Sequence, residues 1–364
     1  SFNPDVSKQA QEVLFSKKSS NIPHPNLYFN GAVVQKSTVQ KHLGVYLDDK
    51  LSFNHHLKHV IDKATKGIAI LRKLHSYVPR KSLLTIYKSF IRSHLDYADV
   101  IYDQPSNCSF SRKIESIQYN AALAITGAIR GTSKEKIYQE LGLEYLSSRR
   151  WLRRLCLFHK VLNRNSPSYM YELIPRPSNP FGTRNQFQIP YFFCRTEAFS
   201  NSFFPTCIKE WRNLHNNLKQ CHSFERFKNL LLVTIRPVQN SIFDVFDHEG
   251  VKLLTRLRLG LSHLNKHQFT HGFCNIVNPM SSCNTEEESV SHFLLRCPNH
   301  INIRNSLMNG IMDIHPTVHL LNDDFITKVL LYGDRKLHFD DNSKILNLTV
   351  TYILASKRFD TALF

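Results

Sequence analysis

The first residues of the chain show short apolar runs separated by turn residues. Two of these runs flank Asn30-Gly31, the pair best suited to a type I′ turn, because both central positions of that turn need a positive φ. Another apolar run follows at 42–47 and ends in two aspartates. We therefore predict a small antiparallel sheet within residues 1–53.

Beyond this sheet the period of the apolar positions changes from two to 3.6 residues. Seven apolar residues from Leu57 to Leu74 have helical spacing, and the lysines and arginines between them lie largely on other faces. This pattern predicts an amphipathic helix of about 20 residues. Pro79 suits the start of a second helix, and a third is predicted from about Ser111. Residues 54–164 should therefore form a helical bundle.

The second half of the chain differs from the first in its proline content and in its pattern of apolar positions. Six prolines among Asn and Ser residues make 165–205 a proline-rich connection, where we place a domain boundary. Residues 206–364 then alternate short helical patterns with polar loops. The predicted fold class is α+β, mainly α: a small N-terminal antiparallel sheet, a helical bundle and a second, mostly helical domain.

The charge of the chain is strongly positive and unevenly placed. The 364 residues include 47 Lys and Arg against 29 Asp and Glu, a net charge of +18. Residues 1–164 hold 26 basic and 12 acidic residues (+14), which leaves 21 and 17 (+4) for 165–364. A field of this sign attracts polyanions, nucleic acid before an anionic membrane surface. The alternative is a solvated basic surface that only improves solubility.

The remaining composition restricts the class of protein. With 42% hydrophobic residues the chain is neither intrinsically disordered nor fibrous. Eight cysteines, about 2% of the residues, are far fewer than the roughly 8–10% of a disulfide scaffold, which favours a reduced, intracellular protein. The sequence has no run of five or more basic residues that would mark a nuclear import signal, so it does not decide between nucleus and cytoplasm. No apolar run approaches the roughly 18–20 residues that span a bilayer, so no membrane partner is expected.

The beginning of the chain is unusual for a complete protein. It starts Ser1-Phe2-Asn3 with no initiator Met, no basic segment and no apolar segment. We therefore expect no secretory signal and expect the chain to be a fragment of a longer protein.

A helix predicted to begin near Ser147 and to continue to about Leu162 carries four arginines at spacings of three and four, which gathers them on one face. They are Arg149, Arg150, Arg153 and Arg154. Because no acidic residue lies between Glu144 and Glu172, we expect this arginine stripe to hold phosphate groups. Trp151 beside it has two interpretations, a platform for stacking a base or a core residue between helices.

Residues 271–300 are rich in cysteine and histidine, whose thiolate and imidazole groups suit tetrahedral zinc. The candidate ligands are Cys274, Cys283, His292 and Cys297. The last three have the spacing C-x8-H-x4-C, but Ser281, two residues before Cys283, replaces the partner of a close cysteine pair. A bound zinc and a metal-free, degenerate knuckle both remain open, with His271 and His300 as substitute ligands.

Tyr97-Ala98-Asp99 resembles the start of the Tyr-x-Asp-Asp turn on which nucleic-acid polymerases hold two metal ions. Val100 follows where the second aspartate is required, and no hairpin pattern surrounds it. We therefore predict no catalytic residue here. The sequence also lacks a nucleophile motif, a Walker loop and a dinucleotide fingerprint.

Six segments, taken in order, resemble one protein family. They are FNPD at 2–5 continuing to Gln9, KHLGVYLD at 41–48, YKSFIRSHLDY at 87–97, YNAALAITGA at 119–128, RLRLGLSHL at 256–264 and HFLLRCP at 292–298. Together they resemble the region that follows the catalytic motif in reverse transcriptases of non-LTR retrotransposons (LINE, Jockey-like). The likeness covers nearly the full chain.

This resemblance implies a role for each part. The palm edge and primer-grip hairpin would occupy 1–53, with His42, Leu43, Gly44 and Val45 holding the growing DNA end. The thumb, packed on an RNA–DNA duplex, would be 54–164, and the Cys/His segment would be the C-terminal knuckle.

The resemblance also limits the activity expected of this chain. The aspartates that bind catalytic Mg²⁺ would lie before Ser1, so this chain alone is predicted to bind RNA and RNA–DNA duplexes without polymerising DNA. The alternative is a decayed or domesticated, non-catalytic protein-interaction module.

Overall fold

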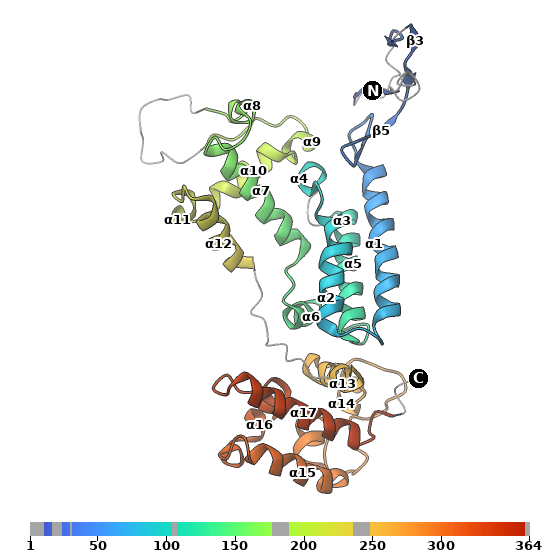
Figure 1. Ribbon diagram of the computed structural model, residues 1–364, viewed down its shortest axis with the longest axis vertical. Helices are drawn as coiled ribbons and strands as arrows, with labels where there is room; N and C mark the ends of the chain where they lie inside the picture. The colour runs from blue at the N-terminus through green and yellow to red at the C-terminus, as the bar shows by residue number, and fades with distance from the viewer. Residues whose placement is uncertain are drawn as a thin grey trace, which may run out of the picture. The chain divides into compact units, whose positions relative to one another are not determined.

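The computed structural model is mainly helical (Figure 1). It describes residues 11–16, 24–29, 31–103, 108–176, 189–235 and 248–360. The predicted fold class, α+β and mainly α, is confirmed, with small two-stranded sheets in place of the one small antiparallel sheet expected at the N-terminus.

In the part of the chain that the structure describes, the strands form three separate two-stranded pairs instead of one sheet. β1 (Gln11–Glu12) pairs with β4 (Gln35–Lys36) in parallel, which the sequence did not predict. The predicted hairpin is present: β2 (Tyr28–Phe29) and β3 (Ala32–Val33) are antiparallel, and Gly31 has a φ of +78°. Asn30, the other turn residue, lies outside the described residues.

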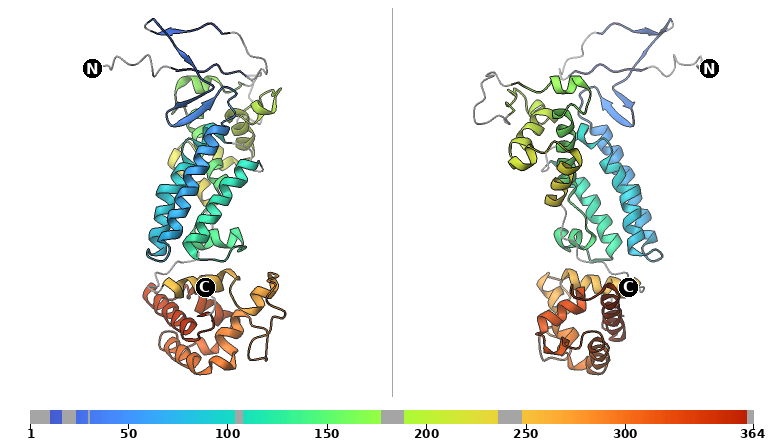
Figure 2. Two further views of the ribbon diagram at one scale, coloured as in Figure 1. Left: turned by 90° about the vertical axis from the view of Figure 1, so that its right-hand side faces the viewer. Right: turned by 60° about the vertical axis from the view of Figure 1, so that its left-hand side comes forward.

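The third pair is the hairpin of β5 (Val39–His42) and β6 (Val45–Asp48), with His42 opposite Val45. Leu43 and Gly44 form its two-residue turn and both have positive φ, 45° and 84°, as a type I′ turn requires. This hairpin lies beside the first turns of α1 (Figure 2).

The predicted amphipathic helix is confirmed as α1 (Asn54–Leu74). Leu57, Val60 and Ala64 are buried along one side, as the 3.6-residue period indicates. Gly67 permits a close approach on this side, because a Cβ atom there would lie 2.6 Å from Cγ1 of Ile91.

The helical run predicted over 54–164 continues in several pieces, and each predicted start lies within two residues of an observed one. The pieces are α2 (Arg80–Ile86), the π-helical η2 (Tyr87–Ile91), α3 (Arg92–Asp96), α4 (Asp99–Tyr102), α5 (Ser109–Thr126), α6 (Lys134–Leu141) and α7 (Leu146–Leu162). Ala98, with a φ of 53°, separates α3 from α4. The chain therefore turns sharply at Tyr97-Ala98.

Five further helices follow the proline-rich connection or lie within it. They are α8 (Ser168–Glu172), α9 (Glu197–Ser200), α10 (Phe203–Arg212), α11 (Asn216–Lys219) and α12 (Phe224–Ile235). Trp211 of α10 packs edge-on against Phe158 of α7 with ring centroids 5.6 Å apart, and Phe227 of α12 stacks on His159 at 4.3 Å. These buried rings attach α10 and α12 to α7.

The C-terminal elements surround a separate apolar core. They are α13 (His248–Leu259), α14 (Asn265–Thr270), η3 (His292–Arg296), η4 (Pro298–His300), α15 (Ile301–Met312), η5 (Val318–Leu320), α16 (Asp323–Tyr332) and α17 (Phe339–Ala355). Leu257, Phe293 and Ile353 are among the buried residues of this core.

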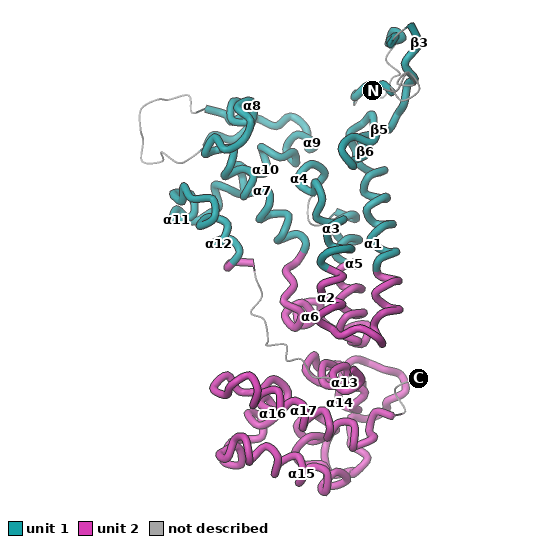
Figure 3. Tube along the Cα trace, viewed as in Figure 1, with its two compact units in different colours: residues 1–67, 88–117, 146–232 teal, residues 68–87, 118–145, 233–364 magenta. Residues whose placement is uncertain are grey.

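The chain divides into two compact units, each assembled from segments that are distant in sequence (Figure 3). Unit 1 contains residues 1–67, 88–117 and 146–232, and unit 2 contains 68–87, 118–145 and 233–364. The boundaries between units pass through α1, α5 and α12, which differs from the four consecutive segments drawn from sequence.

A buried ion-pair network joins the separate segments of unit 2. Glu140 of α6 receives Arg80 and Arg258 on the same carboxylate oxygen, each at 3.1 Å. Arg80 also donates to the hydroxyl of Thr255 at 3.2 Å. Burial lowers the pKa of Arg80, and the carboxylate of Glu140 opposes that shift. Two guanidinium groups therefore depend on one carboxylate.

Candidate nucleic-acid interface and metal centre

The tip of the β5–β6 hairpin is held from outside the hairpin. The four hairpin residues predicted to contact nucleic acid differ in exposure. His42, Leu43 and Gly44 are exposed, Leu43 at 79%, whereas Val45 is buried at 4%. The hydroxyl of Tyr97 donates to the carbonyl oxygen of Leu43 at 2.6 Å. Three of the four predicted hairpin residues are thus presented at the surface on a fixed turn.

The hairpin is joined to α1 through one aromatic ring. The ring of Tyr46 lies 4.7 Å from that of His55 and 5.0 Å from that of His59, measured between centroids. Lys41 places its Nζ 5.6 Å from the Tyr46 centroid on the same hairpin. Lys41 of the hairpin and the two histidines of α1 therefore lie around the same Tyr46 ring.

The outer side of α1 is basic. Lys58, Lys63 and Lys66 are exposed; Lys66 lies opposite the buried side of the helix and the other two flank it, and none forms an ion pair with another described residue. Burial lowers the pKa of His59, and the charges of Lys63 and then Lys41 lower it further, as expected for neighbouring cations. One acid, the exposed Asp62, lies among them. We call the three lysines of α1, together with Lys41 and His42 of the adjacent β5 strand, the α1 basic face.

The arginine stripe, in contrast, is occupied by carboxylates. Arg149 contacts Asp96 at 2.8 Å, and Arg153 contacts both Asp96 and Asp99 at 2.6 Å. Asp99 is 2% exposed; burial raises its pKa, and its ion pair with Arg153 opposes the shift. These two arginines therefore neutralise the acids of the α3–α4 turn.

The other half of the stripe is paired in the same way. Nε of Arg150 lies 2.8 Å from Asp103, and Arg154 pairs with Asp103 on one side and Glu210 on the other. Trp151 is half-buried between them. The prediction of a stripe of four unpaired arginines is corrected: each is paired with a carboxylate from a segment about 50 residues away, which a search of the neighbouring sequence does not find.

Three of the four predicted metal ligands come together. Ligand atoms of Cys283, His292 and Cys297 all lie within 4.8 Å of one another, and this group can hold a metal ion such as zinc. Cys274 is exposed and outside the group, which corrects its assignment as a ligand. His271 and His300, the predicted substitutes, are also outside it.

Neighbouring groups orient these ligands. Nε2 of His292 lies 3.3 Å from the sulfur of Cys283, while Nδ1 lies 3.5 Å from a carboxylate oxygen of Glu286 without a hydrogen bond to it. Ser281 takes the place of a fourth ligand, with Oγ 3.9 Å from the sulfur of Cys297. Hydrogen bonds with Ser281 and Thr285 lower the pKa of Cys283 to about 6. The donors present fit zinc with three protein ligands.

No protein family model, curated protein or solved structure matches this chain. Among the described helices, none combines the length and apolar character needed to cross a membrane. The sequence did contain the signal for the α1 basic face, since Lys58, Lys63 and Lys66 all lie outside the apolar positions of the helix.

Proposed function

We propose that this chain binds nucleic acid along the sugar–phosphate backbone, with the α1 basic face and the tip of the β5–β6 hairpin as its contact surface. The observation that carries the proposal is the set of exposed lysines on α1 without carboxylate partners among the described residues. Lys58 to Lys66 covers about 12 Å of helix axis. At about 3.4 Å per phosphate along one strand, that length matches three to four phosphates.

The proposal agrees with the resemblance to non-LTR retrotransposon reverse transcriptases. In that setting the hairpin acts as primer grip and α1 as part of the thumb, and the natural partners are RNA and RNA–DNA duplex. Positioning is then the contribution of this chain. Asp96 and Asp99, the acids nearest to a polymerase-like motif, are engaged by arginines, so we propose no polymerase chemistry for the described residues.

The test is the salt dependence of binding to a fluorescent RNA–DNA hybrid. Replacing Lys58, Lys63 and Lys66 together with alanine should reduce the slope of log K against log salt by about 1 per lysine. The matched control removes three exposed lysines of unit 2 and should leave the slope unchanged. Its positions are Lys328, Lys336 and Lys344. Equal losses in both variants, or binding that ignores salt, would refute this surface.

We propose further that the metal ion of the Cys283–His292–Cys297 group is zinc and that its place is structural. The three ligands anchor η3 and the loop before it beside the unit 2 core, because His292 is followed directly by the buried Phe293. The reactive chemistry of a catalytic zinc would need a general base near the open position, and the neighbouring Glu286 already contacts His292 and Arg296.

A second candidate function, a protein-interaction module, is favoured by one observation. Tyr28, Phe29 and Val33 on the β2–β3 hairpin expose large apolar side chains, Tyr28 at 67%. Such a surface suits burial against protein. Failure of the chain to bind any duplex would favour this function over the first.

A further inference from the structure

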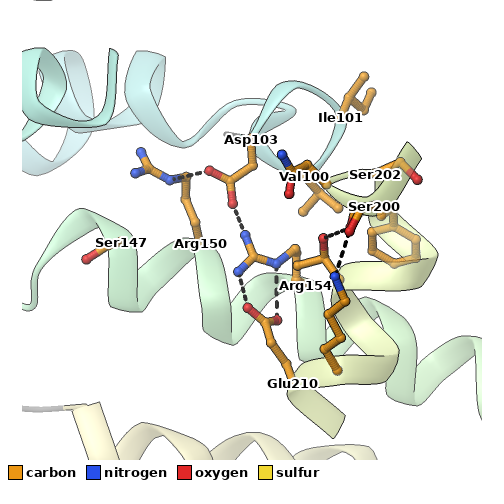
Figure 4. A pocket seen from close by; sticks show the side chains of 13 residues that line it. Val100, Ile101, Asp103, Ser147, Arg150, Arg154, Ser200, Ser202 and Glu210 are labelled. Atoms are coloured by element: carbon orange, nitrogen blue, oxygen red, sulfur yellow. Dashed lines mark hydrogen bonds and ion pairs between the residues drawn. The ribbon is translucent and has the colours of Figure 1, made fainter. Parts of the chain in front are cut away.

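A cavity of about 370 Å³ opens within unit 1 beside Arg150 and Arg154 of the arginine stripe (Figure 4). Its walls are α4, the α7 side that carries Arg150 and Arg154, the turn between α9 and α10, and the first two turns of α10. The volume lies within the range of about 300–1,000 Å³ that is typical of small-molecule sites.

The lining of the cavity carries a surplus of one positive charge. Arg150, Arg154 and Lys209 contribute three cations, whereas Asp103 and Glu210 contribute two carboxylates. This surplus attracts an anion, and a phosphate monoester, with a charge of about −1.5 to −2 near pH 7, would more than offset it. A neutral or cationic ligand would leave this surplus unbalanced.

The partners of Arg154 and Lys209 fix these side chains but use only some of their N–H donors. Arg154 pairs with Asp103 through Nη1 and with Glu210 through Nε and Nη2, which uses three of the five N–H donors of a guanidinium. Lys209 donates to the hydroxyl of Ser200 at 2.7 Å, which uses one of three. Because the carboxylates fix the guanidinium, the remaining donors are already oriented before a ligand arrives.

The start of α10 adds donors on the same side. Ser202 is the N-cap residue, yet its hydroxyl donates to the carbonyl of Phe199 at 2.7 Å and makes no cap hydrogen bond. The N–H groups of Phe203 and Phe204 at the start of this ten-residue helix therefore have no side-chain cap, while Pro205, its third residue, carries no N–H. Ser202 and Phe203 both line the cavity, so the positive end of the helix adds to the charge surplus.

We propose that this cavity binds a phosphate group. Phosphate oxygens accept several charge-assisted hydrogen bonds at once, which matches the combination of guanidinium, ammonium and helix N–H donors. The inference does not depend on the α1 basic face, which lies on other elements of unit 1. The phosphate comes either from the end of a nucleic-acid strand or from a free nucleotide.

Calorimetric titration of the full chain tests the proposal, with 5′-AMP, inorganic phosphate, and one oligonucleotide with and without a 5′-phosphate as probes. Lys209→Ala should weaken AMP binding about tenfold, as loss of one charge-assisted hydrogen bond predicts. Glu210→Gln should strengthen it, because it raises the charge surplus to two. Lys113→Ala, which removes an exposed lysine of the same unit outside the cavity, should change nothing.

The probes also separate the two sources of phosphate. A gain in affinity from the 5′-phosphate of the oligonucleotide that disappears in Lys209→Ala assigns the strand end, while binding of AMP or phosphate alone assigns a free ligand. Absence of binding by all probes, or equal affinities in wild type, Lys209→Ala and Glu210→Gln, overturns the proposal. Lys209 is exposed and Glu210→Gln keeps the side-chain shape, so both variants should fold, which thermal unfolding checks.

Discussion

Replacing Glu140 with alanine is expected to destabilise unit 2 by about 3–5 kcal/mol. The carboxylate is 2% exposed and is shared by Arg80 and Arg258, so its removal leaves two buried guanidinium groups without their counter-charge. Removing one partner of a buried ion pair costs more than the pair contributes, because the remaining charge keeps its desolvation penalty.

Urea unfolding of the full chain, followed by circular dichroism, measures this effect. Glu135→Ala is the matched control, since Glu135 lies on the same helix, is exposed and should change stability by no more than about 0.5 kcal/mol. If Glu140→Ala and Glu135→Ala unfold at the same urea concentration, the network does not stabilise unit 2.

Replacing Ser281 with cysteine is expected to tighten zinc binding by at least about tenfold, or 1.4 kcal/mol. A thiolate at this position would complete a Cys3His tetrahedral set, whereas the native hydroxyl is a poor zinc ligand. Competition with a chromophoric chelator measures the affinity. Cobalt(II) in place of zinc should show a stronger thiolate charge-transfer band in Ser281→Cys than in the native chain.

Two variants control the zinc experiment. His292→Ala removes a buried ligand and should abolish tight binding, whereas Cys274→Ser should have no effect, because Cys274 is exposed and outside the group. A loss of affinity in Cys274→Ser comparable to that in His292→Ala would contradict the three-ligand centre.

Features encoded by neighbouring residues were predictable from the sequence. The apolar period of α1 gave its buried face and its ends, and the spacing of Cys283, His292 and Cys297 gave three ligands that lie together. Both depend on spacing within a short stretch of chain. One local feature was missed: the turn at Leu43 and Gly44 divides the apolar run predicted at 42–47 between two strands.

Features that depend on contacts between distant segments were not. The arginine stripe was correct as a pattern but wrong as a row of unpaired cations, because Asp96, Asp103 and Glu210 reach it from distant segments. Arginine spacing determines which side of a helix is charged. It does not determine whether the fold supplies carboxylates to that side.

The assembly of unit 2 from separated segments has a consequence for dissecting this chain by truncation. A piece that begins at residue 206 would lack 68–87 and 118–145, and so would leave Arg258 without Glu140. A piece that ends at 164 would break unit 1 by discarding α10 and α12. Neither cut yields an independently folding half, so functions are better separated by point substitutions than by shortening the polypeptide.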